Sequence, residues 1–213
     1  MLREMTRLLI LAPLAIEARA LRRGVSRHRP GPVEADYRAE VARTGMGPKA
    51  SARAAARLAV IAGDNTFVVV AGFCGGLRPE IHAGDVIVGT EIRGPSGVVE
   101  LPAAGGLAET LRSAGLTVHA GPLLSSAHLA FGAGRSQMAS GGALGVDMES
   151  YWLLCERSQQ AAVVRAVSDT AGERLLGGML PLGWLRAYRS LVRASAALAA
   201  WAPPPGDLAI SAR

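Results

Sequence analysis

The stretch TFVVVAGFCGG (66–76) decides the fold class of this chain. It is a run of β-branched and small apolar residues without polar alternation, which is typical of a strand buried on both faces of a parallel or mixed sheet. Similar apolar runs alternate with helix-like segments on either side of it. We therefore predict an α/β protein with a single domain and three layers, α/β/α, around a central mixed sheet.

The other elements follow from hydrophobic periodicity and from residues that begin or end helices. Residues 1–202 are assigned to the domain and residues 203–213 to a flexible C-terminal tail. Strands are predicted at 7–14, 37–47, 84–92, 116–127, 143–149 and 161–170, and helices at 16–23, 48–63, 107–115, 150–158 and 183–201.

Composition excludes several classes of protein. The 213 residues are half apolar, enough for one core, and their net charge of +6 permits contact with phosphates or an anionic membrane surface. The arginines are scattered and not interleaved with aromatic residues, so we expect no nucleic-acid binding. No apolar run is long enough to span a membrane. Cys74 and Cys155 lack metal-ligand spacing, so we expect buried, reduced thiols, no metal and a cytoplasmic protein.

A glycine turn, TGMGPKAS (44–51), is predicted where a strand meets a helix. The backbone N–H groups of Gly45, Met46 and Gly47 can bind an anion or a sugar hydroxyl there. The alternative, which local sequence leaves equally open, is a tight turn that needs a positive φ.

A second glycine turn is predicted in AGFCGGLRPEIHAGDV (71–86). Three glycines in five positions, Gly72, Gly75 and Gly76, exceed the need of a chain reversal. They indicate that the backbone approaches a flat ligand closely.

Acidic residues at strand ends are the candidate catalytic groups. Asp169 follows an apolar strand, and partial burial raises a carboxyl pKa toward the range of a general acid. Its alternative role is a helix N-cap. Glu17 either interacts favourably with the dipole at the N-terminus of its helix, which local sequence favours, or faces the ligand-binding site. His128 stands alone and is expected to be a surface or structurally satisfied residue.

Four motifs resemble the nucleoside phosphorylase and nucleosidase superfamily. In order they are LAPLAIEARAL, TGMGPKASARAA, VVVAGFCGGLRPEIHAGDVIVG and GVDMESYWLL…VVRAVSDTAGE, which together span residues 8 to 173. The pairing of the Met-Glu strand end with VRAVSD is the specific part. The resemblance is closest to the methylthioadenosine/S-adenosylhomocysteine nucleosidases and their hopanoid-associated relatives.

The resemblance implies cleavage of a purine nucleoside at its glycosidic bond, without metal or organic cofactor, by a homodimer or higher homo-oligomer. It implies that Asp169 hydrogen-bonds or protonates the purine N7 and that Ser168 orients Asp169. Glu149 would bind the ribose hydroxyls, with Met148 against the sugar. Glu17 would orient and deprotonate the attacking water.

The resemblance also places the segment of Gly72, Phe73, Cys74 and Gly75 beside the base. The position of an aromatic residue that stacks on the purine falls near Leu129. Asp147 is expected to point away from Glu149 and to have a structural role.

This sequence departs from the pattern of the superfamily at two places that bear on its function. Phosphorylases of this superfamily hold phosphate with an arginine at the position that is Val70 here. A valine cannot bind an oxyanion, which favours water as the nucleophile. Arg43 could bind phosphate instead, so phosphate stays open as a co-substrate. The segment 89–106 is shorter than the covering loop of the nucleosidases and has no aromatic residue. A less covered site suits a bulky 5′ substituent.

The sequence thus predicts a hydrolase that releases adenine from a 5′-substituted adenosine, in its most specific form adenosylhopane in hopanoid biosynthesis. A phosphorylase on the same substrate, a methylthioadenosine/S-adenosylhomocysteine nucleosidase and a non-catalytic nucleoside-binding protein are the alternatives. Arginines beside an apolar stripe in the C-terminal helix allow weak membrane-surface contact, with packing on the sheet as the favoured role.

Overall fold

The computed structural model describes residues 6–28, 37–63, 65–128, 132–170, 180–201 and 203. Leu129 and all of the predicted tail except Pro203 lie outside these residues. The strands are β1 Thr6–Ala12, β2 Tyr37–Arg43, β3 Thr66–Gly76, β4 Val86–Gly94, β5 Gly97–Glu100, β6 Val118–Ser125, β7 Gly145–Asp147 and β8 Ala161–Thr170. The helices are α1 Ala15–Val25, α2 Pro48–Ile61, α3 Ala104–Ser113, α4 Gly132–Ser140, α5 Ser150–Leu154 and α6 Leu180–Ala200.

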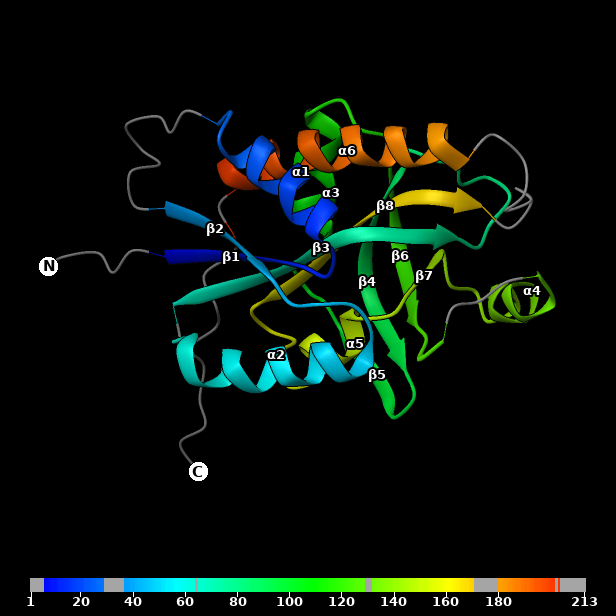
Figure 1. The fold of residues 1–213 in the computed structure, drawn as a ribbon, viewed down its shortest axis with the longest axis horizontal. Coiled ribbons are helices and arrows are strands. Elements are labelled where there is room, and N and C mark those ends of the chain that lie inside the picture. Colours follow the sequence, from blue (N-terminus) through cyan, green and yellow to red (C-terminus); the bar gives the residue numbers. More distant parts are fainter. Residues whose placement is uncertain are drawn as a thin grey trace, which may run out of the picture.

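The strands form one mixed sheet in which β3 is central (Figure 1). β3 pairs in parallel with β1 and β8 and antiparallel with β7. Because β8 also pairs with β4, and β6 joins β4 to β7, the strands β3, β8, β4, β6 and β7 close into a ring of pairings. The predicted mixed sheet is confirmed.

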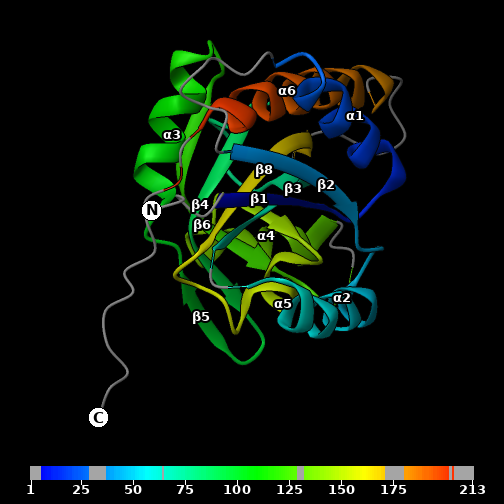
Figure 2. The same ribbon diagram turned by 90° about the vertical axis from the view of Figure 1, so that its left-hand side faces the viewer.

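Helices cover both faces of the sheet, as Figures 1 and 2 show, which confirms the three-layer architecture. Helices α1, α3 and α6 pack with one buried apolar cluster, and α2 and α5 pack with a second cluster on the other face. All but one residue of β3 are buried, and the opening stretch lies between the two clusters. Burial on both faces is the physical reason for its unbroken apolar character.

The turn predicted within 71–86 does not include the three glycines, because β3 continues as a strand through Gly76 and the chain turns only within residues 77–85. These glycines make room for side chains of the protein itself. A Cβ at Gly72 would overlap Glu17 and Arg165, and a Cβ at Gly75 would overlap the Arg135 guanidinium.

Three further expectations need correction. The segment 89–106 is not a short loop, since β4 runs to Gly94 and pairs with β5 as a hairpin. Helix α4 was not predicted. Cys74 is buried as expected, but Cys155 is exposed; both are free thiols.

Helix α6 packs on the sheet, which is the role that the sequence analysis favoured for the C-terminal helix. Ala187, Leu191, Ala194 and Leu198 are buried in the cluster shared with α1 and α3. No helix in the described ranges is both long and apolar enough to cross a membrane. Membrane-surface contact and homo-oligomerisation stay predictions.

Candidate active site

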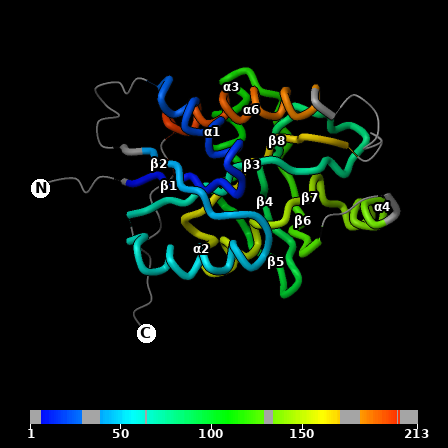
Figure 3. The backbone as a smooth tube through the Cα atoms, in the orientation of Figure 1, coloured from blue at the N-terminus to red at the C-terminus, as the bar shows by residue number. Residues whose placement is uncertain are grey.

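A cavity of about 310 Å³ lies where β1, β3, β7 and β8 end. The path of the chain brings the ends of β3 and β8 to the side on which α4 lies (Figure 3). Open α/β sheets bind ligands at such carboxyl ends. Nine of the sequence-predicted residues line the cavity: Glu17, Met46, Phe73, Cys74, Gly75, Met148, Glu149, Ser168 and Asp169.

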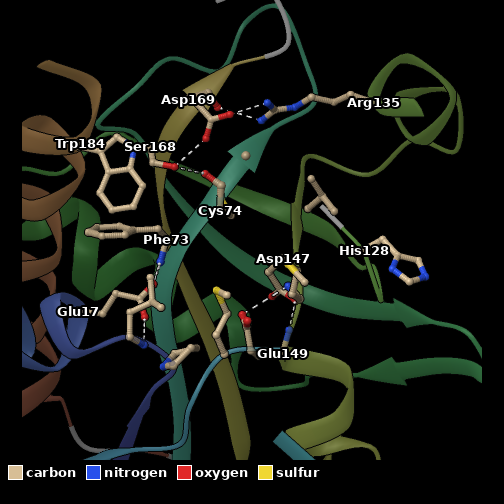
Figure 4. A pocket seen from close by; sticks show the side chains of 16 residues that line it. Glu17, Phe73, Cys74, His128, Arg135, Asp147, Glu149, Ser168, Asp169 and Trp184 are labelled. Atoms are coloured by element: carbon tan, nitrogen blue, oxygen red, sulfur yellow. Dashed lines mark hydrogen bonds and ion pairs between the residues drawn. The ribbon is translucent and has the colours of Figure 1, made fainter. Parts of the chain in front are cut away.

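Four predicted residues are not among the lining residues: Arg43, Gly45, Gly47 and Gly72. Residues that were not assigned to the site also line it: Pro13, Leu14, His128, Arg135, Val146, Asp147 and Trp184. Figure 4 shows Asp169 and Ser168 at one end of the cavity and Glu17 and Glu149 at the other.

Glu17 combines the two roles that the sequence left open. It occupies the third position of α1, where its Oε2 accepts a hydrogen bond from the Leu14 N–H at 2.6 Å and caps the helix. Its Oε1 accepts from the Phe73 N–H of β3, also at 2.6 Å. The residue is buried and lines the cavity. Burial raises the pKa of Glu17, although the Arg165 charge and the two N–H groups act in the opposite direction.

The glycine turn at 44–51 binds an anion that belongs to the protein. The Gly47 N–H donates to Glu149 Oε1 at 3.0 Å, at the N-terminus of α2. Gly45 and Gly47 have positive φ, so the tight-turn alternative also holds. The N–H of Gly47 is thus used to position Glu149 across 102 residues of sequence.

Arg165 lies fully buried among the acids at the end of the cavity where Glu17 and Glu149 lie. Its Nε donates to Asp147 Oδ2 at 3.0 Å, its Nη2 donates to Ser150 Oγ at 2.9 Å, and Nη2 lies 3.6 Å from Glu149 Oε2. Burial raises the pKa of Glu149, while Arg165 opposes that rise. For Arg165 itself, burial lowers the pKa, but the surrounding carboxylates outweigh it and the pKa is raised.

Asp147 is a structural acceptor, and it does not point away from Glu149. Its carboxylate accepts from Ser125 Oγ at 2.6 Å, from the N–H groups of Glu149 and Ser150, and from Ser150 Oγ and Arg165. Strand β7 ends at Asp147, so the alternation of side chains along a strand does not extend to Glu149, and both acids lie next to Arg165.

Asp169 lies at the other end of the cavity, at the end of β8. Its Oδ1 accepts from Ser168 Oγ at 2.7 Å, and its Oδ2 accepts from Arg135 Nη1 at 2.5 Å. Arg135 comes from α4 and also donates from Nη2 to the Asp169 carbonyl oxygen at 3.1 Å. The candidate acid Asp169 therefore forms an ion pair with Arg135, a partner that sequence reasoning missed.

The wall between the two ends is apolar. The rings of Phe73 and Trp184 meet edge to face, with centroids 5.1 Å apart. Cys74 also lines this wall, and burial raises the pKa of its thiol far above the usual range, so it is not a nucleophile here. His128 is exposed at the cavity. Among the described residues, no group of three or more His, Cys, Asp or Glu side chains could hold a metal ion.

The residues weighed for phosphate binding lie away from the cavity surface. Val70 is completely buried in β3, and Arg43 is exposed but does not line the cavity. Within the described ranges, Arg135 is the lining arginine, and its guanidinium is paired with Asp169.

A family model for the phosphorylase superfamily matches residues 33–179, more than half of the chain. The chain belongs to the phosphorylase superfamily. The superfamily, the fold class and the enzyme class predicted from the motifs, nucleosidase or nucleoside phosphorylase, are thereby confirmed. No curated protein sequence matches this member.

Solved structures share the superfamily fold. The 5′-methylthioadenosine/S-adenosyl homocysteine nucleosidase of Campylobacter jejuni is 16% identical, with a TM-score of 0.73 over 92% of this chain and 100% of its own. The Helicobacter pylori enzyme of the same name, complexed with a pyrrolidine compound, is 15% identical, with a TM-score of 0.70 over 91% and 96%. The futalosine hydrolase of Helicobacter pylori is 15% identical, with a TM-score of 0.70 over 90% and 94%.

Of the residues missed from sequence, three differ in the signal that they carry: the lining residues Arg135 and Trp184, and Arg165 behind the cavity. Arg165 interrupts an apolar strand, and a buried charge must be paired, so its role could have been inferred. Trp184 is a scarce aromatic near the start of the last helix. Arg135 carries no such signal, because GAGRSQMAS (132–140) has no apolar periodicity.

Proposed function

We propose that this protein is a purine nucleoside N-ribosyl hydrolase that releases adenine from a 5′-substituted adenosine. The observation that carries the proposal is the set of carboxylates on one cavity, with Glu17, Asp147 and Glu149 at one end and Asp169 at the other (Figure 4). A nucleoside needs an anion beside the positively charged sugar of the transition state and a polar group at the leaving base. The separation of Glu17 and Glu149 from Asp169 supports this orientation of substrate.

Each residue is proposed to act on one part of the substrate. Glu149 accepts hydrogen bonds from the ribose hydroxyls, with Met148 against the sugar, and Asp169 acts on the N7 side of the base. Water attacks C1′ as the bond from C1′ to N9 breaks, and Glu17 takes the proton of that water. The electron pair of the broken bond goes to the purine, which takes up a proton from solvent to become adenine, and Glu17 returns the proton of the water to solvent.

Hydrolysis is proposed over phosphorolysis because neither Val70 nor Arg43 supplies a cation to the cavity. A phosphate dianion needs charge-assisted donors at the sugar end. There the guanidinium of Arg165 is already surrounded by Asp147, Glu149 and Ser150.

An apolar 5′ group is proposed from the lining side chains. Met46 is 59% exposed and Trp184 36% exposed, and both line the cavity. Exposed apolar side chains at a cavity gain from covering by an apolar substituent. An adenosine with a lipid tail, such as adenosylhopane, is the most specific form of the proposal.

The decisive experiment measures free adenine after incubation with adenosine, methylthioadenosine or a lipid-tailed adenosine, each with and without phosphate. Release without phosphate supports the hydrolase, and faster release from the lipid-tailed substrate supports the apolar 5′ group. Release that requires phosphate and forms a ribose 1-phosphate would make the enzyme a phosphorylase. No release from any purine nucleoside would contradict catalysis.

The pH dependence of kcat/KM should reveal the buried carboxylates. A base works only when deprotonated, so a raised pKa moves the acid limb of the profile upward. We expect activity to fall, as pH is lowered, with a midpoint above the usual glutamate value of 4.5. The ionisation of Glu17 and of Glu149 together sets this acid limb of the profile, because burial raises the pKa of both. A midpoint at or below the usual value would show that neither carboxylate must be ionised.

A further inference from the structure

We propose that the outer face of α1 and α6 binds the surface of an anionic lipid bilayer, with the mouth of the cavity turned toward the lipid. This α1–α6 face consists of exposed apolar residues at the starts of the two helices and of six exposed arginines farther along. The arginines are Arg19, Arg22, Arg23, Arg186, Arg189 and Arg193. The inference goes beyond the proposed function, because attraction to a bilayer requires no reaction.

The two helices lie side by side, and both start at the cavity. Figures 1 and 2 show α1 and α6 in one layer over the same face of the sheet. Glu17 in the first turn of α1 and Trp184 near the start of α6 both line the cavity. Farther along α1, Gly24 packs so closely on α6 that a Cβ would overlap Ser195. The helices therefore form one continuous surface that begins at the cavity mouth.

The charge of the α1–α6 face has one sign. The acid of α1 is Glu17, which is buried, and the sequence of α6 contains no acid. Within the described residues, the arginines of this face form no ion pair, although Arg22 and Arg193 donate hydrogen bonds to backbone carbonyl groups. Such a cluster is attracted to anionic lipid, and each arginine near the lipid surface strengthens binding about fivefold.

Apolar residues precede the arginines along the exposed side of each helix. On α6, Leu185 and Arg189 are four residues apart and share one side of the helix. On α1, Ile16, Arg19 and Arg23 repeat this order at intervals of three and four residues. Because both helices start at the cavity, their apolar residues lie at the cavity mouth and their arginines lie behind it.

The exposed apolar side chains at this end favour lipid over an acidic protein as the partner. Ile16, Leu182 and Leu185 are 44%, 49% and 43% exposed, and Trp184 adds an indole ring at the cavity itself. Tryptophan is enriched at the boundary between lipid and water, because its ring is apolar and its N–H is polar. A bilayer surface accommodates both kinds of residue, with anionic headgroups beside the arginines and acyl chains beside the leucines.

Docking by the α1–α6 face turns the cavity mouth toward the acyl chains. A nucleoside with a lipid tail would then enter the cavity without passing through water. This consequence rests on the proposed function, whereas binding to a bilayer can be measured without any substrate.

The test measures sedimentation of the protein with vesicles of phosphatidylcholine that contain about one third phosphatidylglycerol. We expect the wild-type protein to bind these vesicles and to be released above about 0.5 M salt, since salt screens exposed charges. The double variant Arg23→Gln/Arg189→Gln should bind about 30-fold more weakly, from about fivefold for each arginine. Leu182→Ser/Leu185→Ser should bind about tenfold more weakly, because apolar contact with acyl chains is lost.

Two double variants of α2 are the matched controls, because α2 packs on the opposite face of the sheet. Arg53→Gln/Arg57→Gln removes two exposed arginines, and Val60→Ser/Ile61→Ser removes two exposed apolar side chains. Each control therefore changes the protein's charge or apolar surface as much as its counterpart does. Each should alter vesicle binding by no more than about threefold.

Tryptophan fluorescence tests the orientation of the bound protein. Trp184 is the exposed one of the three tryptophans and lies at the cavity. Lipid with brominated acyl chains should therefore quench part of the fluorescence on binding, and Trp184→Phe should remove that quenching. Quenching that persists in Trp184→Phe would show that another face meets the lipid.

Equal loss of binding in the α1–α6 and α2 variants, or equally strong binding to vesicles of phosphatidylcholine alone, would overturn the inference. No binding to the anionic vesicles would also overturn it and leave an acidic protein as the partner of this face. The α1–α6 double variants lie outside the cavity lining, so adenine release from adenosine without vesicles should match wild type. Adenine release without vesicle binding would refute the docking but keep the hydrolase, and vesicle binding without adenine release would do the reverse.

Discussion

Replacing Asp169 with asparagine is expected to lower kcat/KM for a 5′-substituted adenosine by about 10²- to 10⁴-fold, measured as adenine release. Asparagine removes the negative charge that faces Arg135 at 2.5 Å. Its amide can also turn a donor toward the guanidinium, so the arrangement at the base is lost. The fold should be kept, because Asp169 is at the end of β8 and is only partly buried.

Asp85→Asn is the matched control for this variant. Asp85 accepts a hydrogen bond from the His82 N–H at 3.0 Å and lies 2.9 Å from His119 Nε2, but it does not line the cavity. The control should change kcat/KM by no more than about twofold. If Asp169→Asn keeps a similar rate, Asp169 has no part in the chemistry.

Replacing Arg165 with methionine is expected to lower the free energy of unfolding by about 3–5 kcal/mol, measured by urea denaturation at neutral pH. The change leaves Asp147, Glu149 and Glu17 in a buried setting without their shared cation. Activity should fall with stability, because the same guanidinium contacts the residues that hold Glu149. Arg7→Met, which removes a half-buried ion pair, should cost no more than about 1 kcal/mol.

The cost of Arg165→Met should depend on pH in a defined direction. Arg165 lowers the pKa of Glu17 and Glu149, so its removal raises both further above the value in the unfolded chain. The folded state then binds more protons than the unfolded state, and stability falls as pH rises through this window. The difference from wild type should be larger at about pH 8 than at about pH 5. A difference that is the same at both pH values would show that these carboxylates do not depend on Arg165.

The two arginines show how the site uses buried charge. Arg165 favours the ionised form of Glu17 and Glu149, where burial alone would favour their protonation. Arg135 pairs with Asp169 at the other end of the cavity. At each end of the cavity, acidic side chains thus occur together with a buried arginine.

The sequence by itself determined the layers and most strands. Burial on both faces leaves a direct mark on composition, so the run in β3 and that in β8 identified buried strands of the sheet. The acids at strand ends were also readable, because an acid directly after an apolar run is locally distinctive. Glu149 and Asp169 were found in this way together with the motifs, whereas the role of Glu17 came from the resemblance alone.

Only the tertiary structure decided what those acids contact. Gly47 reaches Glu149 across 102 residues, and Arg135 reaches Asp169 across 34. The glycines of β3 looked like a ligand-binding turn, yet Gly72 and Gly75 make room for the protein's own arginines. Contacts between distant residues depend on which strands pair and where each one ends. No local pattern of side chains carries that information, so Arg135, at the end of a long-range contact, could be found only in the folded chain.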